Sequence, residues 1–224
     1  MYGHGIATIA LGELYGMSRD PRIKPKLESA IHLIENCQND QGGWRYAPRK
    51  SDADLSVTVL QVVALRAAKN SGIDVPQVTI DNAVKYVKSC YDENSGGFTY
   101  QPHNRQPGFA RSAAGLYCLQ VCGHYDDAEV ARASDYLGKF KDSGSNEWFT
   151  YGHFYAAPAQ YMIGGETWKS WYQFMNKKLM ESVHRDGDLA SWEPLDHKVG
   201  VVYATAVYTT ILAMPYHYVP LYQR

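Results

Sequence analysis

Apolar residues occur along the chain in two alternating kinds of segment. Five segments are apolar on nearly every side, which is typical of buried helices. They are 5–15, 54–65, 108–122, 152–163 and 200–214. Four segments lie between them and carry apolar residues three and four positions apart, which predicts amphipathic helices at the periphery. They are 25–37, 79–90, 126–140 and 166–184. The pattern therefore predicts an all-α protein of about nine helices in which inner and outer helices alternate.

Helix ends are indicated by single residues. Gly16 and Gly72 are expected to end the first and third helices, because glycine tolerates the left-handed conformation found after many helices. Asp54 or Ser56 is expected to cap the start of the third helix through its side-chain oxygen.

A glycine-rich turn between the second and third helices returns later in the chain. Residues 38–48 read QNDQGGWRYAP and residues 92–102 read DENSGGFTYQP, so that Phe98 takes the place of Trp44. Paired glycines permit a tight turn, and a large aromatic ring can anchor it in the core. Residues 143–151 and 185–194 are expected to form the next turns, around Trp148 and Trp192 respectively. A unit that recurs in this way indicates a repeat architecture.

The spacing of a second motif agrees with the same repeat. The triplet Tyr2-Gly3-His4 returns as Tyr151-Gly152-His153, close to three repeats later. We expect an α/α toroid, here an incomplete ring with apolar helices inside and amphipathic helices outside. An open α-solenoid built from similar hairpins is the alternative. Few segments alternate β-branched and polar residues, so a fold based on a sheet is not expected.

Charge and composition narrow the classes of partner. The formal net charge is −1 and basic residues form no cluster, which argues against nucleic acid and anionic membrane surfaces as partners. No apolar run approaches the roughly 20 residues of a membrane span. Four cysteines are too few to predict a disulfide framework.

The helical pattern begins in the middle of a repeat and has no signal peptide before it. We therefore expect residues 1–224 to be a single domain cut from a longer chain, with an aromatic tail at 216–224. The helices missing from the ring would come from the rest of that chain or from another subunit. If the chain is complete, a cytoplasmic location is expected.

The turns resemble the Q-x-x-x-G-x-W repeat of the prenyltransferase and squalene oxidase repeat superfamily. Gln38, Gly42 and Trp44 carry the resemblance, and residues 95–98 echo it as SGGF. The family includes triterpene cyclases and the β-subunits of protein prenyltransferases, which are α/α toroids. The resemblance implies a central cavity that binds, or acts on, an isoprenoid or another apolar small molecule.

Cyclases of this family protonate an alkene with an aspartic acid in a D-x-D-D-T-A motif. The corresponding residues here read Asp52-Ala53-Asp54-Leu55-Ser56-Val57, so Asp54 falls on the proton donor and Asp52 on the first acid. Leu55 replaces the third acid, and an acid that protonates a double bond needs neighbours that tune it. The resemblance therefore implies Asp54 and Asp52 as catalytic residues of an incomplete motif. The alternative is that Asp54 only caps the following helix.

Residues near the starts of the inner helices are expected to line the ring centre and bind the ligand. They are His4, Thr58, Phe109, Arg111, His153, Tyr155 and Tyr203. Arg111 is expected to pair with Asp54 or with an anion of the ligand.

Zinc is the one cofactor that the sequence suggests. No cofactor is expected, apart from a zinc site that His4, His153 and Asp54 would form if their helix starts converge at one rim of the ring. No C-x-x-C pair is present to support it.

Two further function classes stay open. A glycan- or peptide-binding toroid would use paired carboxylates beside aromatic residues, for which the loops offer Glu147, Asp186, Asp188, Glu193 and Asp196 beside Trp148, Phe149 and Trp192. A structural repeat module would instead have a filled centre and no ligand. A deep apolar cavity would favour the isoprenoid-binding class over both.

Overall fold

The computed structural model describes residues 1–104, 106–142, 148–196 and 199–216. This part of the chain folds into nine α-helices, a short 3-10 helix and one two-stranded hairpin, which confirms a mainly helical protein. The elements are α1 (Tyr2–Ser18), α2 (Lys24–Cys37), α3 (Leu55–Asn70), α4 (Gln77–Ser89), α5 (Phe109–Val121), α6 (Ala128–Phe140), α7 (Phe149–Ile163), α8 (Gly165–Ser182), β1 (His184–Asp186), β2 (Leu189–Ser191), α9 (Val201–Ala213) and η1 (Met214–Tyr216). Most of the expected turn at 143–151 and of the aromatic tail at 216–224 lies outside the described residues.

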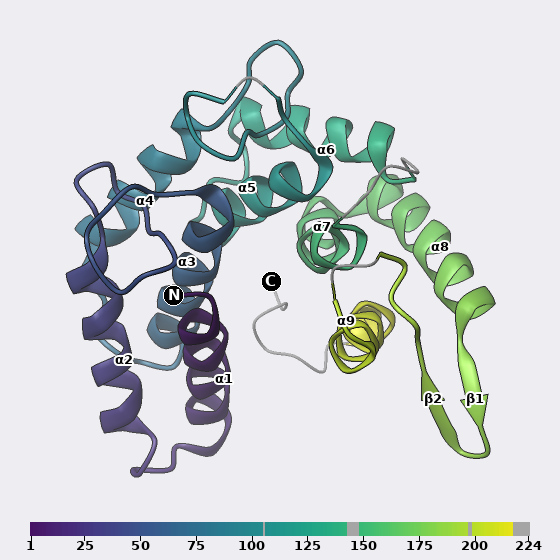
Figure 1. Cartoon of the computed structure of the whole chain (residues 1–224), viewed down its shortest axis with the longest axis horizontal. Coiled ribbons are helices and arrows are strands. Elements are labelled where there is room, and N and C mark those ends of the chain that lie inside the picture. The colour runs from purple at the N-terminus through teal and green to yellow at the C-terminus, as the bar shows by residue number, and fades with distance from the viewer. Residues whose placement is uncertain (105, 143–147, 197–198, 217–224) are drawn as a thin grey trace.

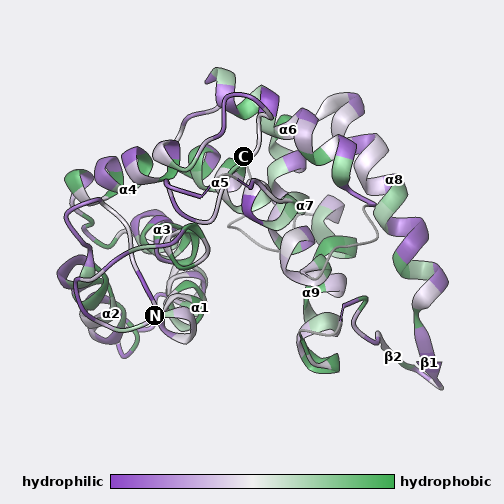
Figure 2. Ribbon diagram, turned by 45° about the horizontal axis from the view of Figure 1, so that its top comes forward, coloured by the Kyte–Doolittle hydropathy of each residue, from purple (hydrophilic) through white to green (hydrophobic). Residues whose placement is uncertain are grey.

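The helices form two curved layers. Along the inner layer, α1 packs on α3, α3 on α5, α5 on α7 and α7 on α9. The outer helices α2, α4, α6 and α8 each pack against inner helices. In Figure 1 the inner helices follow the inside of an arc and the outer helices follow its outside. In Figure 2 hydrophobic and hydrophilic residues alternate along the outer helix α8, as expected for an amphipathic helix with one buried face.

Helix α3 is held at the centre of the first half of the arc. Asp54 caps it, since its Oδ1 accepts a hydrogen bond from the Val57 N–H at 2.9 Å. The helix contains many β-branched residues, which have modest helix propensity. Nearly all of its side chains are buried, and burial of each Val or Leu contributes roughly 1.5–3 kcal/mol, which outweighs the propensity cost.

Three aromatic residues anchor the turns in the same way. Their backbone N–H groups donate to a hydroxyl oxygen 13 or 14 residues later, on the next inner helix. The pairs are Trp44 with Thr58 (3.1 Å), Phe98 with Ser112 (2.8 Å) and Trp192 with Thr205 (3.1 Å). All three rings are buried. Trp44 and Phe98 therefore occupy equivalent environments, as the repeat predicts, and Trp192 joins them.

The two helices at the ends of the inner layer are less buried than their sequences predicted. In α1 only Gly5, Thr8 and Gly12 are buried, whereas Leu14 is 51% and Met17 69% exposed. Helix α9 is likewise buried on one side only. The reason is that each has an inner neighbour on one side alone, α3 for α1 and α7 for α9. Even so, no helix in the described ranges combines the length and the apolar character that crossing a membrane requires.

Two local predictions were wrong. Gly16 does not end the first helix, which continues to Ser18 and ends at Arg19 in the left-handed conformation. Residues 184–191 form an antiparallel hairpin rather than a simple turn, with His184 paired to Ser191 and Asp186 to Leu189. Gly187 supplies the positive φ of 56° that the two-residue hairpin loop requires.

The four cysteines are free thiols. Cys37, Cys90 and Cys118 are buried, whereas Cys122 is partly exposed. Burial raises the pKa of the Cys90 thiol to about 12. The thiols therefore pack as small apolar side chains in the described structure.

Candidate functional site

A cavity of about 1040 Å³ opens on the concave side of the arc. This volume is at the upper end of the range of roughly 300–1,000 Å³ that is typical of small-molecule sites. Every inner helix contributes to the apolar part of its wall, which includes Ile6, Leu60, Ala110, Phe154 and Val207. A single site is therefore assembled from residues spread over the whole chain.

The polar part of the wall consists mainly of tyrosines. Six of them line the cavity, namely Tyr2, Tyr46, Tyr100, Tyr151, Tyr155 and Tyr203. Burial raises the pKa of each of Tyr2 and Tyr203 to about 12, so both stay protonated at neutral pH. Among the lining residues that the structure describes, Arg111 is the one with a charged side chain. The surface suits an apolar molecule with few polar groups.

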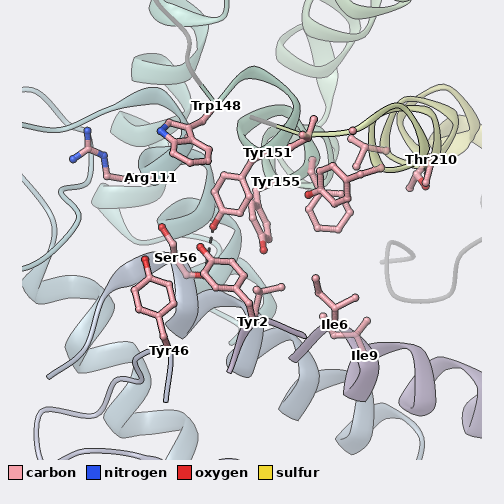
Figure 3. A pocket seen from close by; sticks show the side chains of 18 of the residues that line it. Tyr2, Ile6, Ile9, Tyr46, Ser56, Arg111, Trp148, Tyr151, Tyr155 and Thr210 are labelled. Carbon is pink, nitrogen blue, oxygen red and sulfur yellow. Dashed lines mark hydrogen bonds between the residues drawn. The ribbon is translucent and has the colours of Figure 1, made fainter. Parts of the chain in front are cut away.

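Figure 3 shows how the tyrosines from facing helices approach one another. Tyr151 and Tyr155 extend from α7 toward α1, and Tyr2 extends from α1 toward them. The Tyr151 hydroxyl donates a hydrogen bond to the backbone oxygen of Ser56 at 3.4 Å. The rings of Tyr151 and Tyr155 meet edge to face, with their centroids 5.0 Å apart. Helices α1, α3 and α7 are thus joined across the floor of the cavity.

Asp54 is fully buried behind this wall. Its Oδ2 accepts a hydrogen bond from the Arg45 guanidinium at 3.0 Å, while its other oxygen caps α3. Desolvation by burial raises the pKa of Asp54, and the Val57 N–H and Arg45 oppose that rise. Asp54 itself is not among the lining residues.

Arg45 connects Asp54 to the cavity wall. Its guanidinium lies over the rings of Tyr46 and Tyr100, 4.9 and 5.5 Å from their centroids, and donates to the Tyr100 hydroxyl at 3.3 Å. The hydroxyls of Tyr46 and Tyr100 are 2.7 Å apart. Asp52, with its side chain 61% exposed, lies 3.5 Å from the Arg45 Nε. Both acids of the incomplete motif, Asp52 and Asp54, therefore pair with Arg45. Tyr46 and Tyr100 lie between Arg45 and the cavity and line its wall.

The two histidines point away from the cavity. His4 Nε2 lies 3.0 Å from the backbone oxygen of Ala30 in α2, and His153 Nε2 lies 3.2 Å from that of Lys141 after α6. Burial lowers the pKa of His153 to about 3, which keeps its ring neutral. Each histidine thus bonds to a different outer segment, and the structure does not bring them together with Asp54. Within the described ranges, no group of three His, Cys, Asp or Glu residues is arranged to hold a metal ion.

Two other predicted ligand-binding residues serve the core. Thr58 is fully buried and its hydroxyl oxygen accepts the hydrogen bond of Trp44 described above. The Phe109 ring lies 4.7 Å from the His153 ring, centroid to centroid, and is also buried. Neither residue lines the cavity.

The remaining three, Arg111, Tyr155 and Tyr203, do line the cavity. Of the two partners predicted for Arg111, Asp54 pairs with Arg45 instead, and an anion of the ligand stays a prediction. The Arg111 guanidinium lies against Gly108 and, in Figure 3, points away from Tyr151 and Tyr155.

Tyr2 and Tyr151 are lining residues that were not predicted, and Trp148, which was predicted only for glycan binding, is a third. The signal for two of them was present in the repeated Tyr-Gly-His triplet. Residues two apart on a helix point to nearly opposite sides, so a histidine directed at the outer layer leaves the tyrosine facing inward.

The two tryptophans of the glycan-binding alternative lie in different environments. Trp192 is buried, and its indole N–H donates to the Leu179 backbone oxygen at 2.8 Å, so it anchors the fold. Trp148 is 49% exposed and lies at the cavity. Asp186 and Asp188 belong to the exposed hairpin region. Asp186 and Asp188 therefore do not share a site with Trp148. Asp196, by contrast, accepts a hydrogen bond from the Thr150 N–H, two residues after Trp148, and Glu147 lies outside the described residues.

Comparison of the sequence with protein-family models finds no match, and neither does comparison with curated proteins.

Proposed function

We propose that the chain binds an elongated apolar small molecule of isoprenoid type in its concave cavity. The observation that carries this proposal is the cavity itself, about 1040 Å³ in volume and lined by aliphatic and aromatic side chains from all five inner helices. Removing apolar surface from water contributes about 25 cal/mol per Å², so such a ligand gains affinity along its whole length. A cavity of this size disfavours the alternative of a structural module with a filled centre.

Within the same proposal, the arc is a part of an α/α toroid similar to terpene cyclases and protein prenyltransferase β-subunits. The alternation of inner and outer helices and the shared anchoring of Trp44, Phe98 and Trp192 support it. The exposed apolar faces of α1 and α9 would be covered by further helices, from the rest of a longer chain or from another subunit.

Binding has more support than cyclisation. Asp54 has the raised pKa that a general acid needs, but it is paired with Arg45 and lies behind the tyrosine wall. A proton donor must come within hydrogen-bond reach of the reacting atom. Catalysis by Asp54 and Asp52 is therefore the second candidate, and binding of the ligand is the function to test first.

The test fills the cavity from an exposed position. Ala206 on α9 lines the cavity and is exposed, so Ala206→Trp adds a large ring without disturbing the core. We expect this variant to bind farnesene, a C15 isoprenoid hydrocarbon, at least about tenfold more weakly than the unmodified chain, a loss of about 1.4 kcal/mol. Binding is measured by displacement of the uncharged fluorescent probe N-phenyl-1-naphthylamine.

The matched control is Ala7→Trp, which places the same ring at an exposed position of α1 that does not line the cavity. Its affinity for farnesene should remain within about twofold of the unmodified chain. Failure of the unmodified chain to bind the hydrocarbon, or equal loss of affinity in both variants, would remove the proposal.

A further inference from the structure

Three helices bring tyrosine hydroxyls to one part of the cavity. They are those of Tyr2 on α1, Tyr151 and Tyr155 on α7, and Tyr203 on α9. After desolvation by burial, the nearby Tyr151, Tyr203 and Tyr2 are the next causes that raise the pKa of Tyr155. All four also line the same cavity, and the rings of Tyr151 and Tyr155 meet with their centroids 5.0 Å apart, so the four residues form one hydroxyl cluster in an otherwise apolar wall.

The hydrogen bonds of this cluster are incomplete. Tyr151 donates to the backbone oxygen of Ser56, and Tyr2 lies close enough to both for them to influence its ionisation. By contrast, no hydrogen bond of ordinary geometry reaches the Tyr155 hydroxyl from any described residue, although Tyr155 is 1% exposed. A buried polar group without a partner is unfavourable, so a ligand atom that accepts its hydrogen bond would be favoured.

Tyr203 lies at the cavity and can bind the same ligand atom as the unpartnered Tyr155 hydroxyl. Tyr203 is half-buried at the cavity, and within the described ranges its hydroxyl makes no hydrogen bond. The Tyr155 hydroxyl is covered in this conformation, so its χ1 angle must change to open it to the cavity, because rotation of the ring about its own axis does not move the para oxygen. The two hydroxyls then supply donors from adjacent helices, α7 and α9.

The charges around the cluster favour a neutral partner. Arg111 is the charged residue among the described lining residues, and its guanidinium points away from Tyr155. An ionised group placed at the tyrosine cluster would lose its hydration without gaining a counter-charge there, which is strongly unfavourable in an apolar cavity. A neutral oxygen needs only the hydrogen bonds that the tyrosines can donate.

We propose that the ligand of this cavity carries an uncharged, hydrogen-bond-accepting oxygen, as in an alcohol, ketone or ester, that is bound by Tyr155 and Tyr203. This inference rests on the proposed function, because it specifies the class of apolar molecule that the cavity accepts. A pure hydrocarbon would fill the same space but leave both hydroxyls without partners.

The experiment compares farnesol with farnesene, which share a C15 isoprenoid chain and differ in the terminal hydroxyl. The quantity measured is the ratio of the dissociation constants for farnesene and farnesol. When this ratio is compared between variants, the different aqueous solubilities of the two ligands cancel. We expect Tyr203→Phe and Tyr155→Phe each to lower the preference for farnesol by about fivefold to tenfold, about the value of one hydrogen bond, with farnesene binding unchanged. Farnesoic acid, the carboxylate analogue, should bind more weakly than farnesol at neutral pH.

Tyr86→Phe is the matched control. Tyr86 is also 1% exposed and its hydroxyl also lacks a hydrogen-bond partner among the described residues, but it does not line the cavity. Thermal unfolding shows that each variant is folded before its ligands are compared.

The inference is overturned if the preference for farnesol is the same in both cavity variants as in the unmodified chain, or if farnesoic acid binds more tightly than farnesol. If the unmodified chain fails to bind farnesene, the proposed function fails, whereas binding of farnesene with an unchanged preference for farnesol overturns this inference alone.

Discussion

The turn at 38–48 and the region at 184–194 reach the same anchor by different routes. In both, a buried tryptophan donates its backbone N–H to a threonine on the next inner helix. In both, the indole N–H donates to a backbone oxygen of the preceding outer helix, that of Ile34 in α2 or Leu179 in α8. The first region arrives through a Gly-Gly turn and the second through a β-hairpin. The buried aromatic ring and its backbone hydrogen bond to the next inner helix are therefore common to the repeats, Phe98 included, and the loop before them varies.

The glycines of the two regions show the same difference. Gly42 has φ of 93°, and a Cβ added to it would lie 2.1 Å from the backbone oxygen of Asn82 in α4. Gly187 also has positive φ, but a Cβ there would meet nothing within 4 Å. The first turn is packed against an outer helix, whereas the hairpin extends into solvent.

The largest expected effect comes from removing the shared anchor. Trp44→Ala and Trp192→Ala should each lower the free energy of unfolding by about 3–5 kcal/mol, because each leaves a cavity and a carbonyl without its partner. Trp148→Ala, at a half-exposed ring, should cost less than about 1 kcal/mol. Urea denaturation measures all three. A cost near that of Trp148→Ala at either buried tryptophan would show that the two regions are not equivalent.

The next effect separates the two loops. Gly42→Ala should destabilise the chain by about 2–4 kcal/mol, because the left-handed conformation and the contact with Asn82 both oppose a Cβ. Gly187→Ala should cost about 1 kcal/mol, from conformation alone. Thermal unfolding of the pair gives the comparison directly. Equal costs would mean that the first turn is not held against α4 as described.

The smallest effect concerns the hydroxyl partners. Thr58→Val keeps the shape of the side chain but leaves the Trp44 N–H without an acceptor, so a loss of about 1–2 kcal/mol is expected. Thr205→Val should cost less than about 1 kcal/mol, since Thr205 is only partly buried and water can replace its oxygen. Chemical denaturation of both variants resolves the difference. A greater loss at Thr205 would contradict the assignment of Thr58 as the more buried partner.

Periodicity predicted which segments are helical because each inner helix is apolar around its circumference and each outer helix along one stripe. It did not predict how many neighbours a helix has. Helix α1 has the same apolar character as α3, yet α3 is enclosed by α1, α2, α4 and α5, while α1 is half-exposed. The hairpin escaped detection because its strands have three residues each, too few for an alternating pattern to be visible.

The candidate site was predicted in part, and for a geometric reason. Tyr155 and Tyr203 were placed correctly because they lie on the inner helices and face the concave side. His4 and His153 were placed at helix starts without regard to direction, and successive residues on a helix turn by about 100°. Asp54 was recognised both as a motif acid and as a cap, and the structure confirms the cap.

The positions of two cysteines have a consequence for observing the repeats separately. Cys37 ends α2 and Cys90 follows α4, so each thiol sits at the entrance of one Gly-Gly turn, and both are buried. A thiol reagent can modify them only when the surrounding repeat opens. The molecule thus contains two intrinsic reporters of local opening, one per repeat, and their relative labelling rates would rank the stability of adjacent units without any introduced residue.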